Sequence, residues 1–284
     1  MGVDIPAFAL PGRHVRPRAM TDANAMTYGD YLALEPLLSA QHPISDHHDE
    51  MLFIVIHQTK ELWLKQTIHE LRLGLELVRQ DKLIEVHKIL SRVSRIQSVM
   101  TQSWDILATL TPTDYLTFRG VLGTSSGFQS GQFRTVEFLL GLREPGHLKH
   151  HAEGSDSHRT LSEAAAQPSL WDEANAALAR AGFAVPAEAL DRDWGETYVP
   201  NDAVEAAWAE VYRDVDRYWP FYQFAEKLMD IDDALATWRH KHVITVERII
   251  GFKRGTGGTP GVPYLQSTLG KRAFPELWSL RTRL

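Results

Sequence analysis

The sequence predicts an all-α fold, a helical bundle of long helices with a small helical insertion. Apolar residues recur at steps of three and four along several long segments, which is the spacing of one helical face. The chain contains no convincing strand hairpin and no internal repeat. We therefore expect a single all-α domain over residues 1–284.

The N-terminal part is predicted to be the least regular. Residues 1–27 are rich in proline and arginine and are expected to form an arm. The segment TYGDYLALEPLLSAQ that begins at residue 27 predicts a short helix, stopped or kinked at Pro36.

Two long helices should follow. The first lies within residues 42–80, where Ser45 or Asp46 is the expected N-cap and Asp49 and Glu50 suit the positive end of the helix dipole. The second lies within DKLIEVHKILSRVSRIQSVMTQSWDILATL. Its apolar positions are Leu83, Val86, Ile89, Leu90, Val93, Ile96 and Met100.

The next helix begins at TPTDYL. Thr111 should cap it, Pro112 should take the first helical position, and Asp114 should complete a capping box. Glycine and serine then crowd residues 120–131, and QFRTVEFLLGL resumes helical spacing.

The C-terminal half contains the predicted insertion. Residues 143–203 are rich in His, Ala, Asp and Glu, and are expected to form a peripheral insert of two or three short helices. From Asn201 a last long helix is predicted, broken near Pro220.

Composition excludes several functional classes. The chain has 284 residues, a net charge of −6 and no cysteine. The absence of cysteine excludes disulfides, thiolate metal sites, iron–sulfur clusters and a cysteine nucleophile. No basic footprint favours nucleic acid, no apolar run is long enough for a membrane span, and no signal peptide is recognisable, so a cytoplasmic protein is expected.

Two histidines occupy apolar helical faces. His240 and His242 are two residues apart, so on a helix they point about 200° apart and cannot easily bind one metal together. His242 shares the apolar stripe, whereas His240 shares a polar face. His57 lies on the apolar face of the first long helix, with Phe53 four residues before it. Both are interpreted either as buried histidines with satisfied hydrogen bonds or as groups on the two sides of a haem.

Other patterns allow further hypotheses. His47 and Asp49 resemble half of a two-histidine, one-carboxylate iron site, although acids are expected at a helix start anyway. Tyr115 and Arg119 are four apart on one helical face, and the guanidinium suits either a protein acid or a ligand carboxylate.

The glycine-rich segment FKRGTGGTPG does not fit a phosphate-binding loop. A helix precedes it, and no Lys-Ser/Thr pair ends it. We interpret it as a mobile turn whose Thr256 and Thr259 hydroxyls close over a site, or as a helix C-cap with glycine at Gly255.

Several long motifs together resemble the tryptophan 2,3-dioxygenase family. They are TYGDYL, HHDEMLFIVIHQTKELWLK, DYLTFRGVLGTSSGFQSGQFR, WRHKHVITVERIIGFKRGTGGTPGVPYL and FPELWSLRT, in the family's order. The resemblance implies a bundle around a b-type haem that is active in its ferrous form. It also implies addition of both atoms of O₂ across the indole C2=C3 bond of L-tryptophan to give N-formyl-L-kynurenine, the first step of the kynurenine pathway. A homotetramer, a dimer of dimers, is implied as well.

The resemblance also assigns roles to residues of this chain. His242 would be the axial ligand of the haem iron, and His57 the distal catalytic histidine that faces the indole N–H. Arg119 would bind the substrate carboxylate, and Thr256 the amino-acid end. The other implied substrate-binding residues are Phe53, Tyr115, Ser126 and Gly127, with Tyr28 and Tyr31 reaching a neighbouring subunit's site. A non-enzymatic haem or ligand sensor on the same scaffold is the alternative function.

Overall fold

The computed structural model describes residues 26–284. It divides the chain into two compact units, residues up to His42 and Pro43–Leu284, and each is described by itself. Within the described residues there are helices and turns but no strand, so the predicted all-α fold is confirmed. No helix in this part of the chain has both the length and the apolarity that crossing a membrane requires.

The first unit contains two short helices, α1 (Tyr28–Leu32) and α2 (Leu34–Leu38). The predicted kink at Pro36 was wrong, because the break lies at Ala33, whose φ of 50° is left-handed. Pro36 instead occupies the first turn of α2, where its missing N–H has no intrahelical partner to lose. Residues 1–25 of the predicted arm lie outside the described residues.

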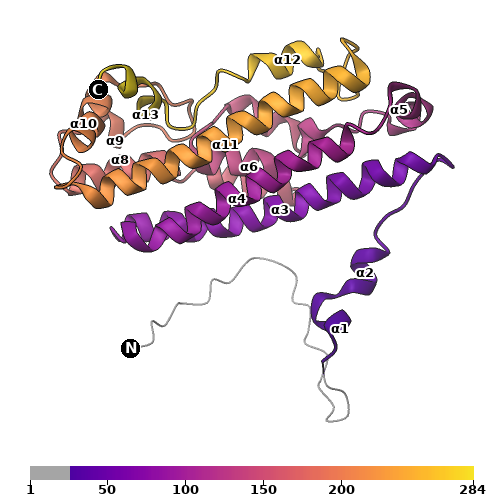
Figure 1. Cartoon of the computed structure of the whole chain (residues 1–284), viewed down its shortest axis with the longest axis horizontal. Coiled ribbons are helices and arrows are strands. Elements are labelled where there is room, and N and C mark those ends of the chain that lie inside the picture. The colour runs from indigo at the N-terminus through magenta and orange to yellow at the C-terminus, as the bar shows by residue number, and fades with distance from the viewer. Residues whose placement is uncertain (1–25) are drawn as a thin grey trace. The chain divides into compact units, whose positions relative to one another are not determined.

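Three long helices form the body of the second unit. They are α3 (His48–Arg79), α4 (Leu83–Leu107) and α11 (Trp219–Ile250), and α4 packs against both of the others within this unit (Figure 1). All seven apolar positions predicted for the second long helix are buried in the main core, as the 3.6-residue period requires. The helix period therefore decided which face of α4 meets its neighbours.

The start of α3 differs from the prediction. Neither Ser45 nor Asp46 caps it, since its N-cap is His47 and no side-chain cap bond forms. The buried Glu50 carboxylate instead accepts the backbone N–H groups of Ile44 and Ser45, at 2.9 and 2.8 Å. These hydrogen bonds favour the charged carboxylate and lower the pKa of Glu50. They also hold in place the chain that enters the helix.

The helix α5 (Pro112–Arg119) begins as predicted. Thr111 Oγ1 accepts the N–H of Asp114, and the Asp114 carboxylate accepts the N–H of Thr111, both at 3.2 Å. The glycine- and serine-rich stretch forms two 3₁₀ turns, η1 (Gly120–Leu122) and η2 (Gly127–Gln129). Helix α6 (Gly131–Leu140) follows and packs against α3.

The segment predicted as a peripheral insert contributes to the main core. It contains η3 (Pro145–His150), α7 (Asp156–Ala165), α8 (Leu170–Arg180) and α9 (Ala187–Leu190). The main core takes from it Leu161, Ala164, Ala165, Leu170, Trp171, Ala174, Ala177, Leu178, Phe183 and Ala189. Its alanines, which suggest a solvent-facing helix by composition, let helices approach closely enough to bury the large side chains between them.

The segment is joined to the remaining helices by two tryptophans. Helix α10 (Asp202–Arg213) supplies Trp208, which stacks on Trp171 with ring centroids 5.6 Å apart. Trp208 Nε1 donates to Asn175 Oδ1 at 2.8 Å, and both residues are fully buried. The break before Pro220 is confirmed, because α11 starts at Trp219. The chain ends in α12 (Val262–Ser267), α13 (Pro275–Ser279) and η4 (Leu280–Thr282).

The buried Trp208–Asn175 hydrogen bond leads to a prediction about stability. Asn175→Ala leaves the indole N–H buried without an acceptor, so the free energy of unfolding should fall by about 1–3 kcal/mol. Urea unfolding followed by circular dichroism measures this change. The exposed Gln102→Ala change on α4 is the control and should have almost no effect. Equal stability of the Asn175 variant and the unchanged protein would contradict a core role for this segment.

Candidate active site

His57 is held in a defined orientation on α3. Its Nδ1 lies 2.6 Å from the carbonyl oxygen of Phe53. A carbonyl only accepts hydrogen bonds, so Nδ1 carries the proton and Nε2 keeps a free lone pair. Burial lowers the pKa of His57, which keeps the ring neutral at pH 7. The side chain can therefore accept a hydrogen bond from a ligand N–H.

An aromatic wall surrounds this histidine. The Phe53 ring lies 4.2 Å from the His57 ring and 5.8 Å from both Tyr115 and Phe118. These residues belong to a second, smaller apolar cluster, separate from the main core. The wall suits a flat apolar ligand group, because aromatic faces and edges pack well against such a ring.

His242 lies on α11, and His240 is exposed as the helical period predicts. The His242 imidazole stacks on the ring of Trp104 from α4, with centroids 4.4 Å apart and planes at 10°. Burial, followed by the nearby charges of Lys60, His57 and Arg134, lowers the pKa of His242 to about 3. A neutral imidazole at pH 7 is the form that binds a metal.

Arg119 occupies the last turn of α5. Among residues 26–284 no acidic side chain lies within ion-pair distance of its guanidinium, so the interpretation as a salt bridge to a protein acid is not supported. Its Nη2 donates to the Arg254 carbonyl, and its buried Nε has no partner in the described chain. Burial raises the pKa of Tyr115, four residues earlier, and the nearby charge of Arg119 opposes that shift. The guanidinium thus retains capacity for a carboxylate ligand.

Two loops meet beside Arg119. Thr256 Oγ1 donates to the carbonyl of Ser125, which joins the glycine-rich turn after α11 to the loop before η2. A Cβ on Gly257 would lie 2.7 Å from the Cβ of Ser126, so the close approach of the loops requires glycine there. Ser126 accepts from the N–H of Phe128 and forms a capping box for η2, which begins at Gly127.

The structure does not unite every predicted site residue. Tyr28 and Tyr31 lie on α1 in the first unit, where their side chains are 76% and 75% exposed. The hypothetical iron site at His47 and Asp49 has no support, since no group of three or more possible metal-binding His, Asp or Glu residues occurs in the described part of the chain.

Three residues near the histidines were not predicted from the sequence. They are Lys60, one turn after His57, and the two tryptophans Trp104 and Trp238, whose rings lie 4.4 and 5.1 Å from His242. Their spacing along the helices was the sequence feature that could have placed them near the histidines. Lys60 follows His57 by three residues, and Trp104 continues the buried stripe of α4 four residues after Met100.

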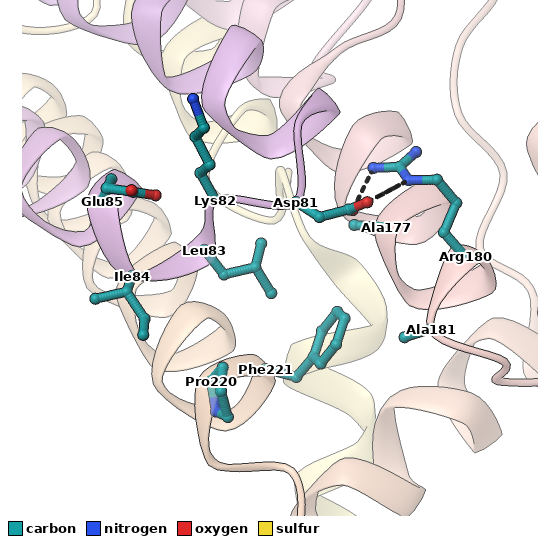
Figure 2. Close-up of a pocket in the computed structure, with 10 residues that line it drawn as sticks. All are labelled: Asp81, Lys82, Leu83, Ile84, Glu85, Ala177, Arg180, Ala181, Pro220 and Phe221. Carbon is teal, nitrogen blue, oxygen red and sulfur yellow. Dashed lines mark hydrogen bonds and ion pairs between the residues drawn. The ribbon is translucent and has the colours of Figure 1, made fainter. Parts of the chain in front are cut away.

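A cavity of about 610 Å³ lies elsewhere in the second unit, between the α3–α4 turn, the end of α8 and the start of α11 (Figure 2). Arg180 donates to Asp81 at 2.8 Å on one side of it, and Phe221 lines another. None of the predicted site residues lines this cavity. His57 precedes this end of α3 by about 30 Å along the helix, so the cavity is distinct from the candidate site.

Comparison with known proteins shows the family to which the chain belongs. The family model described as tryptophan 2,3-dioxygenase matches residues 14–210 and 193–284. The chain belongs to the tryptophan 2,3-dioxygenase family. The match includes every residue to which a site role is given above.

Relatives named tryptophan 2,3-dioxygenase align over most of the chain. The protein of Caulobacter vibrioides is 64% identical over 262 residues, which is 92% of this chain and 100% of the relative. The protein of Bacillus thuringiensis subsp. konkukian is 54% identical over 91% of this chain and 93% of the relative. The protein of Ralstonia pickettii is 52% identical over 92% of this chain and 94% of the relative.

Proposed function

We propose that this chain is a haem-dependent dioxygenase that adds O₂ across the indole C2=C3 bond of L-tryptophan and forms N-formyl-L-kynurenine. The observation that carries the proposal is one neighbourhood containing two neutral imidazoles and an arginine without an acidic partner among the described residues. Family membership supplies the substrate and the reaction class. The product contains the whole of the substrate and both oxygen atoms.

The residues around His242 fit a haem. The imidazole is neutral, and the rings of Trp104 from α4 and Trp238 from α11 lie against it. Buried N–H groups of Trp104 and Trp238 lack acceptors in the described chain, as expected where a non-protein group belongs. His242 would hold the haem iron, and a ferrous b-type haem would supply O₂ binding and the redox chemistry.

His57 would orient the indole. Its Nδ1–H is committed to the Phe53 carbonyl, which leaves Nε2 to accept the indole N–H. Because that N–H is a very weak acid, a hydrogen bond that fixes the ring position is favoured over full proton removal. The wall of Phe53 and Tyr115 would hold the apolar face of the ring and exclude water from it.

The amino-acid end would be held by α5 and the two loops. Arg119 would bind the carboxylate through its Nε, which has no hydrogen-bond partner in the described chain, with Tyr115 beside it. The Thr256 hydroxyl donates to a backbone carbonyl of the neighbouring loop. When the substrate binds, this hydroxyl would exchange that carbonyl for the amino-acid end of the substrate. Ser126 and Gly127 would form the adjoining backbone surface.

Removing His57 should slow turnover while leaving the haem in place. One lost neutral hydrogen bond to the substrate corresponds to a decrease in kcat/KM of about tenfold, or ~1.4 kcal/mol. The exposed His69→Ala on the same helix is the control. With 1-methyltryptophan, which has no indole N–H to donate, His57→Ala should react no more slowly than the unchanged protein. An unchanged rate with tryptophan would remove His57 from the mechanism.

Self-association as a homotetramer, a dimer of dimers, is part of the proposal. On α3 the large apolar side chains Met51, Val55 and Leu62 are 41%, 43% and 49% exposed, and a partner subunit would cover them. Tyr28 and Tyr31 would reach a neighbouring site. Light scattering of the purified protein measures the mass, and a monomer would contradict this part of the proposal.

An absorbance spectrum of the reduced protein, followed by L-tryptophan and air, tests the function directly. A Soret band and the appearance of N-formylkynurenine are expected. A Soret band with tryptophan binding but no product would instead support the haem or ligand sensor. A colourless protein would contradict both functions.

A further inference from the structure

Lys60 is a buried lysine whose ammonium group has no hydrogen-bond or ion-pair partner among the described residues. It lies on α3, three residues after His57 and on the same face, and its side chain is 6% exposed in a region of aromatic rings. Its Nζ lies 3.0 Å from the ring centroid of Trp104. No hydrogen-bond acceptor within residues 26–284 contacts this ammonium group.

Other buried cations in the described chain are paired. Arg239 donates to Glu137 at 2.8 Å, and Arg134 pairs with the same carboxylate. Arg143 donates to four backbone carbonyls. A buried charge is costly unless it is paired and hydrogen-bonded, and a cation–π contact replaces only part of that interaction. Burial lowers the pKa of Lys60 to about 7, because its surroundings stabilise the charged ammonium group less well than water does.

The surroundings of Lys60 contain donors and positive charge. The indole N–H groups of Trp104 and Trp238 are also buried without an acceptor in the described residues. The positive charges of Lys60 and Arg134 both lower the pKa of His242. A group that fits this neighbourhood must therefore bring acceptor oxygens and negative charge.

We infer that Lys60 forms an ion pair with a propionate carboxylate of the bound haem. This inference rests on the proposed function, because it requires His242 to hold a haem. A carboxylate provides the acceptors and the negative charge that the neighbourhood lacks. The four-carbon stem of lysine lets the ammonium leave the Trp104 ring and reach a carboxylate without moving α3. Lys60 is then a haem-binding residue, contributed by the same helix as the distal histidine.

Haem retention tests the inference without relying on catalysis. The rate of haem loss from the holoprotein to an excess of apomyoglobin should rise about 10- to 100-fold in Lys60→Gln, as expected for a lost hydrogen bond between charged groups. Lys60→Arg keeps the charge and should lose haem nearly as slowly as the unchanged protein. Lys65→Gln, an exposed lysine on the same helix, is the matched control.

Haem dimethyl ester separates the ion pair from a packing role. In this molecule both propionates are neutral, so reconstituted unchanged protein and Lys60→Gln should lose it at the same rate. The inference is overturned if Lys60→Gln retains ordinary haem like the unchanged protein. It is equally overturned if the substitution accelerates loss of the ester by the same factor. A wild-type protein that binds no haem would contradict the proposed function itself, which distinguishes the two failures.

Discussion

Replacing His242 by alanine should abolish haem binding, and with it the Soret band and all formation of N-formylkynurenine. The substitution removes the proposed axial ligand, whose neutral imidazole faces the ring of Trp104. The neighbouring His240 does not substitute for it, because His240 points away and its Nδ1 lies 2.8 Å from the Ala236 carbonyl oxygen. The measurement is the Soret absorbance per protein chain after purification.

His240→Ala is the matched control for this experiment. It removes an imidazole two residues away on the same helix and should leave the spectrum unchanged. Helical circular dichroism of both variants shows whether the chain is folded, since α11 contributes to the main core independently of His242. A normal Soret band in a folded His242→Ala protein would contradict the ligand assignment.

The second large effect is expected at Arg119. Arg119→Ala should weaken tryptophan binding by about 2–5 kcal/mol, because it leaves the substrate carboxylate without its bidentate partner. Calorimetric titration of the haem-loaded protein under nitrogen measures this affinity. Tryptamine, which lacks the carboxylate, should bind Arg119→Ala and the unchanged protein equally.

The comparison of the two ligands isolates the carboxylate contact. Equal weakening of tryptophan and tryptamine would show that Arg119 supports the loop through Arg254 instead of binding the substrate. Unchanged affinity for tryptophan would show that the guanidinium does not contact it. Arg119→Lys should recover only part of the affinity, since an ammonium group lacks the planar pair of donors.

Much of the fold follows from periodicity and capping chemistry. The spacing in α4 identified all seven of its predicted core positions, and Thr111 with Asp114 identified the start of α5. Local rules failed where another interaction was available. Glu50 bonded the backbone near Ser45 and removed the expected cap, and Ala33 made the turn that Pro36 was expected to make.

The candidate site was predictable to a smaller extent. Periodicity separated His242 from His240, and the long motifs carried the family resemblance. The tautomer of His57 required the position of the Phe53 carbonyl. The absence of an acidic partner near Arg119 in the described residues was likewise visible only once helices distant in sequence were packed together.

The sequence by itself determined the all-α class, the buried faces of the long helices, the exposed position of His240 and the family. These depend on residue spacing within one segment or on long continuous motifs. Only the tertiary structure decided that the alanine-rich segment joins the main core and that the loops of Thr256 and Ser125 meet. It also decided that Lys60 is buried against Trp104, with no hydrogen-bond acceptor for its ammonium group in the described residues. Each of these depends on contacts between residues far apart in the chain, and the packing of several helices fixes such contacts together.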